Sequence, residues 1–412
     1  MPSDSRDSDD NQSRAKRLGV WLVGARGAIS TCVFYGLEGL ANEWVAPVGL
    51  TTSRGAFTKL DLCPFDEIVL GGHEISTRGL SLAAGELVRH QVLRPDLVAA
   101  ASAEAAAYDA RVKPGILDGP DVGMADLDPE SARLGALSPR KQIAALAEDL
   151  RAFKESENVE RVVMVYLAST EAWREPSDDW NELASFERAL DAGQAVPASS
   201  LYAYAALQEG AAFVNFTPNA GATLPAIEAF ADARGLPHCG NDGKTGETLL
   251  KTTLAPMFAA RGFKVRSWQG YNMLGNRDGE VLSDPARALQ KKRNKDEALR
   301  QILDDPDVHS LVGIDYVPSL HDWKTAMDYV HFEGFLGTMM SLQFTWTGSD
   351  SALAAPLILD LARLAEYSMR RGEVGVMKHT ACFFKSPLAG GTHDFLAQVR
   401  ELERYAERAA RG

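Results

Sequence analysis

The sequence has few cysteines, and no two of them are close together. Its four cysteines are Cys32, Cys63, Cys239 and Cys382, with no CxxC pair among them. This spacing predicts neither a zinc ribbon nor a disulfide framework. Buried, reduced thiols are the expected state.

Long apolar runs and excess positive charge are also missing. No apolar run reaches the roughly 18 residues that span a bilayer, and the start, MPSDSRDSDDNQSRAKR, lacks the apolar core of a signal peptide. We therefore expect a cytoplasmic protein with no membrane partner, in which residues 1–17 form a disordered leader. The net charge of −13 argues against a nucleic-acid partner, because phosphate backbones are bound by clustered Lys and Arg. The ligands are expected to be small.

What is present is a large α/β pattern. With 412 residues, 45% of them hydrophobic, the chain exceeds one simple domain. Apolar, β-rich runs at 17–25, 45–53, 67–72, 161–169 and 213–218 alternate with helical stretches. This alternation predicts a Rossmann-type doubly wound parallel sheet.

The pattern changes after residue 240. The runs at 265–274, 311–320 and 335–348 are typical of longer strands in a different sheet, and amphipathic helices return at 355–372 and 393–410. We therefore expect a nucleotide-binding domain at 18–240, an inserted α+β domain at 241–354, and a C-terminal segment, 355–412, that returns to the first domain.

The first strand-to-helix turn is an imperfect nucleotide motif. It reads GARGAIS, with Gly24 and Gly27 present but Arg26 and Ile29 at the positions of two fingerprint glycines. By itself it fits either a dinucleotide site or an ordinary turn.

The acid that normally binds the cofactor's ribose is also displaced. The expected second strand ends in TTSRG, where Arg54 even suggests a cofactor with an extra phosphate. Glu74, after the third run, is a substitute acid, or else a glutamate that caps the next helix.

Lysine is the scarcer basic residue, with 14 Lys against 29 Arg, yet nine lysines lie between Lys244 and Lys385. Only lysine offers a compact ammonium whose pKa can be shifted for proton transfer. Surface solvation is the expected role of Lys251, Lys264 and Lys378.

The other lysines of this region lie in GNDGKTG, QKKRNKDE, HDWKTAMD and FFKSPL. A site that binds a sugar phosphate and moves its protons needs several ammonium groups, with carboxylates that set their proton affinity. Turn-forming stretches hold Asp242, Asp278, Asp322 and Asp350, which suits that role and also ordinary turn-capping. GNDGKTGET is not a P-loop, because His238 stands where the motif needs glycine.

Several motifs together resemble, in order, those of the myo-inositol-1-phosphate synthase family. They are FDEIVLGGHEIS, GNDGKTGET, YNMLGNRDGEVL, the KKRNK run, DYVPSLHDWKTAMD, SDSALAAPLILDL and FFKSPL. The resemblance covers nearly the whole chain after the leader.

The resemblance implies an isomerase that converts glucose 6-phosphate to 1L-myo-inositol 1-phosphate with NAD as a cofactor that is not consumed. Oxidation at carbon 5 makes a proton on carbon 6 removable, the enolate attacks the carbon 1 aldehyde, and the carbon 5 ketone is then reduced. The resemblance also implies that the inserted domain is catalytic and builds a homotetramer.

Site residues follow from the same resemblance. The implied catalytic residues are Lys291, Lys324, Lys385, Asp242, Asp350 and Lys295. The implied cofactor-binding residues are Gly24, Ala25, Arg26, Gly27, Ala28, Ile29, Ser30, Glu74, Thr170, Thr245, Asn276, Asp278, Asp322 and Ser351. No pattern decides whether a metal is needed.

Two departures in site loops leave alternatives open. Arg277 and Glu247 replace an asparagine and a glutamine of the family's motifs, and they form a compensating charge pair or reshape the substrate pocket. The rival substrate is fructose 6-phosphate, which the same chemistry closes to a five-membered carbocycle. Further rivals are a simple NAD-dependent sugar-phosphate dehydrogenase and a catalytically silent binding protein.

Overall fold

The chain folds around two separate sheets. The computed structural model describes residues 17–117, 126–172, 174–275, 299, 302–303, 305, 308–388 and 390–411. Residues 1–16 lie outside the described part, so the leader stays a prediction.

The larger sheet has seven parallel strands in the order β11-β6-β5-β4-β1-β2-β3. Its strands are β1 (Leu18–Val23), β2 (Ile68–Glu74), β3 (Val112–Pro114), β4 (Arg161–Tyr166), β5 (Ala212–Asn215), β6 (Pro237–Gly240) and β11 (Gly375–Val376). The chain leaves β1 first toward β2 and later toward β4. This is the doubly wound order, and it confirms the predicted fold class.

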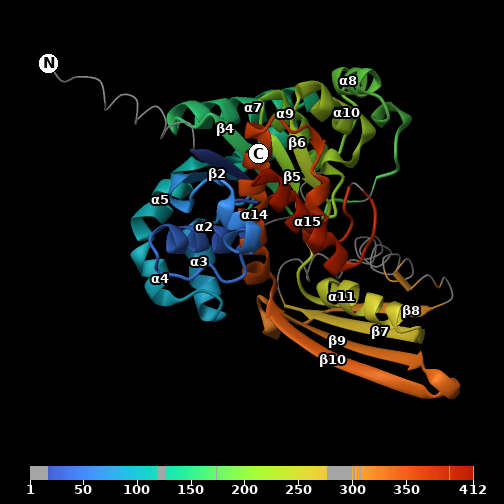
Figure 1. The fold of residues 1–412 in the computed structure, drawn as a ribbon. Helices are drawn as coiled ribbons and strands as arrows, with labels where there is room; N and C mark the ends of the chain where they lie inside the picture. Colours follow the sequence, from blue (N-terminus) through green and yellow to red (C-terminus); the bar gives the residue numbers. More distant parts are fainter. Residues whose placement is uncertain are drawn as a thin grey trace.

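Helices cover both faces of this sheet (Figure 1). Along β1, Leu18 and Leu22 pack on one face and Trp21 on the other, as the alternation of strand side chains requires. The first face carries α2 (Ala28–Ala41), α3 (Leu80–Arg89), α4 (Pro95–Ala100), α5 (Ser102–Arg111), α14 (Asp350–Arg370) and α15 (Phe395–Ala409). The second carries α6 (Pro129–Gly135), α7 (Pro139–Ser156), α8 (Leu183–Asp191), α9 (Ala198–Gln208) and α10 (Pro225–Arg234).

The second sheet has four strands in the order β10-β9-β7-β8. They are β7 (Lys264–Leu274), β8 (His309–Tyr316), β9 (Trp323–Glu333) and β10 (Met339–Ser349). One face packs against α11 (Gly246–Ala260) (Figure 1). Trp268 and Phe258 lie in the core between them. β9 is a strand that the sequence did not predict.

After this sheet the chain returns to the first one. α14 packs on α2 and β4, and Gly375–Val376 pairs with Pro237–His238 as an added edge strand. The C-terminal segment therefore adds an edge strand to the seven-stranded sheet rather than forming a unit of its own.

The predicted strand at 45–53 is wrong. Gly49 has a φ of +89°, and Thr51–Ser53 is a short 3₁₀ helix, η1. The N–H groups of Thr51 and Thr52 donate to the Asp360 carboxylate on α14 (2.7 and 3.1 Å). Because these donors bind α14, they are not available to a sheet ladder.

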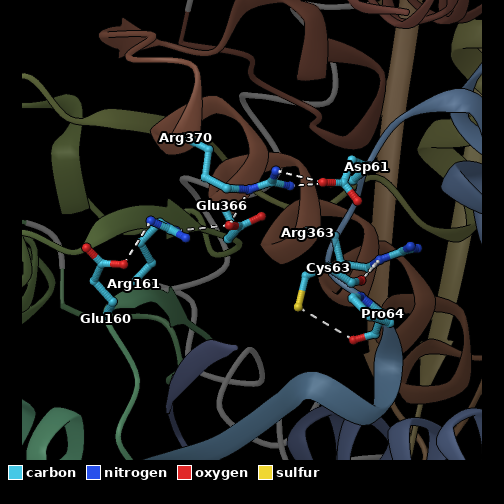
Figure 2. Close-up of polar contacts among 8 residues, drawn as sticks. All are labelled: Asp61, Cys63, Pro64, Glu160, Arg161, Arg363, Glu366 and Arg370. Carbon is cyan, nitrogen blue, oxygen red and sulfur yellow. Dashed lines mark hydrogen bonds and ion pairs between the residues drawn. The ribbon is translucent and has the colours of Figure 1, made fainter. Parts of the chain in front are cut away.

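Ion pairs fix α14 to the same segment and to the start of β4. Figure 2 shows Glu366 accepting from Arg161 (3.0 Å) and from Arg370 (2.6 Å), while Arg370 reaches Asp61 and Arg363 donates to the carbonyl of Cys63. These contacts set the position of α14, whose first turn carries two predicted site residues.

The four cysteines are buried thiols outside any disulfide, as predicted. Across the described ranges, no helix is both long and apolar enough to cross a membrane.

Candidate active site

The predicted nucleotide turn lies where the sheet order reverses. The Leu167 N–H donates to Val23 O (2.9 Å). A Cβ added to Gly24, whose φ is +91°, would lie 3.3 Å from backbone atoms of Leu167 and Ala168. Only glycine accommodates this approach, which brings the turn against the loop after β4. Ligands of doubly wound sheets bind at this point.

Backbone hydrogen bonds hold the turn and leave the start of α2 open. Gly24 and Ala25 donate to His73 O (2.9 and 3.0 Å), and the Ser30 hydroxyl donates to Gly24 O (2.7 Å). Gly27 precedes α2 without a side-chain cap, and it is exposed. The first N–H groups of α2 have no partner within the helix, so this end of the helix could bind a pyrophosphate.

Glu74 lies at the end of β2, beside this turn. Its Oε2 accepts from the Arg26 N–H (2.9 Å) and its Oε1 from the Ile75 N–H (2.8 Å). Since 45–53 is not a strand, β2 is the sheet's second strand and Glu74 has the usual position of the ribose-binding acid. Glu74 does not cap α3, whose N-cap is Gly79.

Two arginines of the prediction have other surroundings. The Arg26 guanidinium pairs with Asp109 on α5 (2.6 Å), a partner that the sequence did not reveal. Arg54 follows η1 rather than a sheet strand, so the argument for an extra cofactor phosphate loses its basis.

Thr170 is buried in the loop after β4. Next to it, the Glu171 N–H donates to Asn219 Oδ1 (2.8 Å), and the Glu171 carboxylate accepts from the N–H of Ser199 (2.6 Å), at the start of α9. These bonds fix the two loops that follow β4 and β5.

Asp242 and Lys385 form an ion pair at the carboxyl end of β6. Lys385 Nζ lies 2.8 Å from Asp242 Oδ1, and the Lys385 N–H donates to Asp242 O (2.7 Å). Asp242 is 6% exposed and has a φ of +63°. Its N–H donates to Thr217 O (2.9 Å). Two segments that are 143 residues apart thus meet in one rigid pair.

A second ion pair, Lys324–Asp350, contacts this loop at Thr245, three residues after Asp242. The Thr245 hydroxyl donates to Asp350 Oδ1 (3.2 Å), and Lys324 Nζ lies 3.4 Å from Asp350 Oδ2. The structure therefore brings Thr245, Lys324 and Asp350 together from three separate motifs.

Asp322 connects these residues to the nucleotide turn. Its two oxygens accept from the hydroxyls of Ser349 (2.5 Å) and Ser351 (2.7 Å), and burial raises its pKa. Burial and then the charge of Asp322 raise the pKa of Cys32 on α2. Asp322 and Ser351 thus lie close to the helix that starts at the turn. Ser349, which also caps α14, was missed, although a serine before a helical run is a recognisable cap.

Lys244, between Asp242 and Thr245, is a buried lysine that the sequence did not single out as a site residue. It is 3% exposed, and its ammonium donates to Gln398 Oε1 on α15 (2.7 Å). Burial lowers its pKa to about 8. Lys244 ties the loop of both ion pairs to the C-terminal helix.

The expected surface role of Lys251 is wrong. It lies on α11 itself and is 3% exposed, with Nζ 2.6 Å from Glu247 Oε1 on the same helix and 3.7 Å from Asp328 Oδ1 on β9. Glu247 also accepts from Asn272 (2.6 Å). A glycine at position 270 makes space for this carboxylate, because a Cβ added there would lie 2.5 Å from Glu247 Oε1. A buried carboxylate needs such a partner, and the α11–sheet contact supplies it.

Some predicted residues lie outside the described part. They are Lys291, Lys295, Asn276 and Asp278, and also Arg277, the proposed partner of Glu247. Among the residues with described positions, no group of three or more His, Cys, Asp or Glu side chains forms a metal site.

The doubly wound sheet, the open turn and the lysine–carboxylate pairs at its carboxyl end define the class of the protein, a dinucleotide-dependent α/β enzyme. The next level of identification comes from its similarity to known proteins.

A family model described as myo-inositol-1-phosphate synthase, of an NAD-binding type, matches residues 18–406. The inositol-3-phosphate synthase 1 of Bacteroides thetaiotaomicron is 33% identical over 403 residues, which cover 92% of this chain and 90% of that one. The enzyme of Spirodela polyrhiza is 34% identical over 400 residues, covering 87% and 76%. The chain therefore belongs to the myo-inositol-1-phosphate synthase family.

Solved structures agree on the fold. Inositol-3-phosphate synthase from Caenorhabditis elegans has a TM-score of 0.83 at 22% identity, covering 96% of this chain and 86% of that one. A myo-inositol-1-phosphate synthase-related protein from Thermotoga maritima has a TM-score of 0.75 at 20% identity, covering 95% and 98%. The predictions of family, isomerase class and NAD are confirmed.

Proposed function

We propose that this protein cyclises glucose 6-phosphate to 1L-myo-inositol 1-phosphate. The observation that carries the proposal is the presence of two lysine–carboxylate pairs, Lys385–Asp242 and Lys324–Asp350, both anchored to the loop that follows β6. The relatives' name, inositol-3-phosphate synthase, supports the same reaction.

The described residues fit NAD. The uncapped start of α2 receives the pyrophosphate, and Glu74 accepts from the adenosine ribose. Asp322 and Ser351, close to α2, border the nicotinamide end. Bound NAD supplies the oxidation at carbon 5 and its reversal.

The lysines carry the proton chemistry between those two events. An ammonium group stabilises the enolate and the alkoxide of ring closure in a site that excludes water. Lys385 is held from both its side chain and its backbone by Asp242, so its ammonium is pre-positioned. Lys324 is held less tightly, at 3.4 Å from Asp350. Lys291 and Lys295 are proposed to complete the set.

The start of α11 is the proposed phosphate site. Thr245 precedes this helix without capping it, since its hydroxyl donates to Asp350 instead. Free N–H groups at a helix N-terminus attract a phosphate dianion. The one acid of the first turn, Glu247, is neutralised by Lys251 below the helix.

Glu247 is one of the two departures that left fructose 6-phosphate open as the rival substrate. Glu247 bonds to Lys251 and Asn272, under α11. This departure from the family's motif is therefore accommodated away from the phosphate, and it does not by itself reshape the pocket.

We also propose a homotetramer built through the four-stranded sheet. The face opposite α11 exposes a row of large apolar side chains in register, with Tyr271 opposite Met327 and Tyr329 one pair further along β9. At the hairpin tip, Phe335 and Leu336 are 87% and 85% exposed. An open apolar sheet face of this kind is typical of an interface between copies. Cytoplasmic location remains part of this proposal.

The test is product identification. Purified protein is incubated with substoichiometric NAD and either glucose 6-phosphate or fructose 6-phosphate, and phosphorylated products are identified by NMR. A cyclitol phosphate from glucose 6-phosphate supports the proposal. A carbocycle from fructose 6-phosphate alone, or steady accumulation of NADH, would replace it with the rival substrate or with a dehydrogenase.

A further inference from the structure

Contacts of His321 and Trp323 with His90, together called the clasp, join the turn before β9 to the end of α3. The imidazole rings of His90 and His321 are stacked, with centroids 4.3 Å apart and planes 10° apart. The Trp323 indole N–H donates to His90 O (2.7 Å). His90 directly follows α3, so His321 and Trp323 both contact the residue at the C-terminal end of this helix.

The turn alternates between this clasp and the active site. His321 and Trp323 contact His90, whereas Asp322 accepts from Ser349 and Ser351, and Lys324 pairs with Asp350. Because Asp322 and Lys324 directly follow His321 and Trp323 in the chain, fixing His321 and Trp323 restricts the positions of Asp322 and Lys324 as well.

The backbone at His321 is unfavourable for histidine. Its φ is +55° with a ψ of −123°, a region that favours glycine. The turn is also packed tightly, because a Cβ on Gly275 would lie 2.3 Å from the His321 nitrogen. A strained residue persists where its surroundings hold it, and the ring stack on His90 is what the histidine contributes.

From this geometry we propose that His90 is a positioning residue. Through His321 and Trp323 it holds Asp322 on Ser351 and Lys324 on Asp350, and it touches neither substrate nor cofactor itself. The inference rests on the proposed function only for its kinetic readout.

The decisive variant is His321→Gly, which relieves the backbone while removing the stack. A purely structural role predicts an equal or more stable protein with normal turnover. The clasp predicts that kcat falls roughly tenfold to a hundredfold, as expected for slightly misplaced groups, while KM for glucose 6-phosphate changes less than about twofold. His321→Phe keeps an aromatic ring for the stack and should restore most of kcat.

Amide hydrogen exchange of residues 317–326, measured without substrate, reads the clasp directly. Exchange should be faster in His321→Gly and near the wild-type rate in His321→Phe. Asn158→Gly is the matched control, because Asn158 also has a positive φ (+53°) but lies after α7; it should leave both readouts unchanged. Normal exchange or normal kcat in His321→Gly overturns the proposal. If the wild type turns over no sugar phosphate, the proposed function fails, and exchange alone decides the clasp.

Discussion

The ammonium of Lys385 lies 2.8 Å from a carboxylate oxygen of Asp242, and the Lys385 backbone N–H donates to the carbonyl of the same residue. This double contact joins a loop after β6 to a segment near the C-terminus. The geometry of the pair is therefore fixed by the contact between these two segments, and neither segment alone determines it.

Lys385→Ala should remove turnover without removing NAD. An ammonium that stabilises an oxyanion or transfers a proton contributes roughly 10²–10⁴-fold to the rate, so kcat should fall by that factor. NAD affinity, measured by calorimetry, should stay within about twofold, since the turn at Gly24 is distant in the fold from β6. Lys378→Ala, at an exposed position nearby in sequence, is the control. A Lys385→Ala enzyme with normal kcat contradicts the site assignment.

Glu74→Gln should weaken NAD binding. The carboxylate holds the Arg26 N–H and is proposed to accept from the ribose hydroxyls, and an amide loses both the charge and one acceptor. The Kd for NAD should rise about tenfold, corresponding to about 1.4 kcal/mol. Glu104→Gln, exposed on α5, should leave Kd unchanged. An unaltered Kd in Glu74→Gln would assign the ribose to another residue.

Lys244 should make stability depend on pH in the alkaline range. Burial lowers its pKa from 10.5 to about 8, so between these values the unfolded chain binds more protons and the free energy of unfolding rises with pH. Below pH 8 both states are protonated, and the penalty for burying the ammonium is fully present.

The comparison is urea unfolding of wild type and Lys244→Met at pH 7 and pH 10. Because other lysines titrate in both proteins, their contributions cancel in the difference. Relative to the variant, the wild type should gain on the order of 1–3 kcal/mol between the two pH values. A stability difference that is independent of pH would show that Lys244 has an ordinary pKa.

Met327→Glu should break the proposed assembly. Met327 is 51% exposed on the open face of the four-stranded sheet and lies opposite Tyr271 on β7, so a charge there would be buried without a partner in an interface. Light scattering after size exclusion should show a tetramer for the wild type and smaller species for the variant. Lys264→Glu, exposed at the end of β7, is the control. A monomeric wild type contradicts the tetramer.

The sequence predicted those parts of the fold that have a local signal. β1, β2, β4 and β5 are continuous apolar runs, and α7 and α14 have clear helical periodicity. β6 and β11 are only four and two residues long, and β9 carries Lys324 and Asp328 among its apolar residues. These three strands are defined by their neighbours, which a single sequence does not show.

The site shows the same division. The structure pairs Asp242 with Lys385 and brings Thr245 and Lys324 to Asp350, and the resemblance named all five of these residues. It could not show that Lys244 and Lys251 are buried, because their surroundings come from α15 and from the second sheet. The clasp at His90 was equally hidden, since its partners are more than two hundred residues away.

The most direct test of the central claim uses glucose 6-phosphate labelled with deuterium at carbon 5. If oxidation and reduction occur at the same carbon within one catalytic cycle, the label should be retained at the corresponding carbon of the inositol phosphate, as measured by NMR, with NAD below stoichiometry and no net NADH. Loss of the label into accumulating NADH, or a product that remains an open-chain ketone, would contradict the proposed redox-neutral cyclisation.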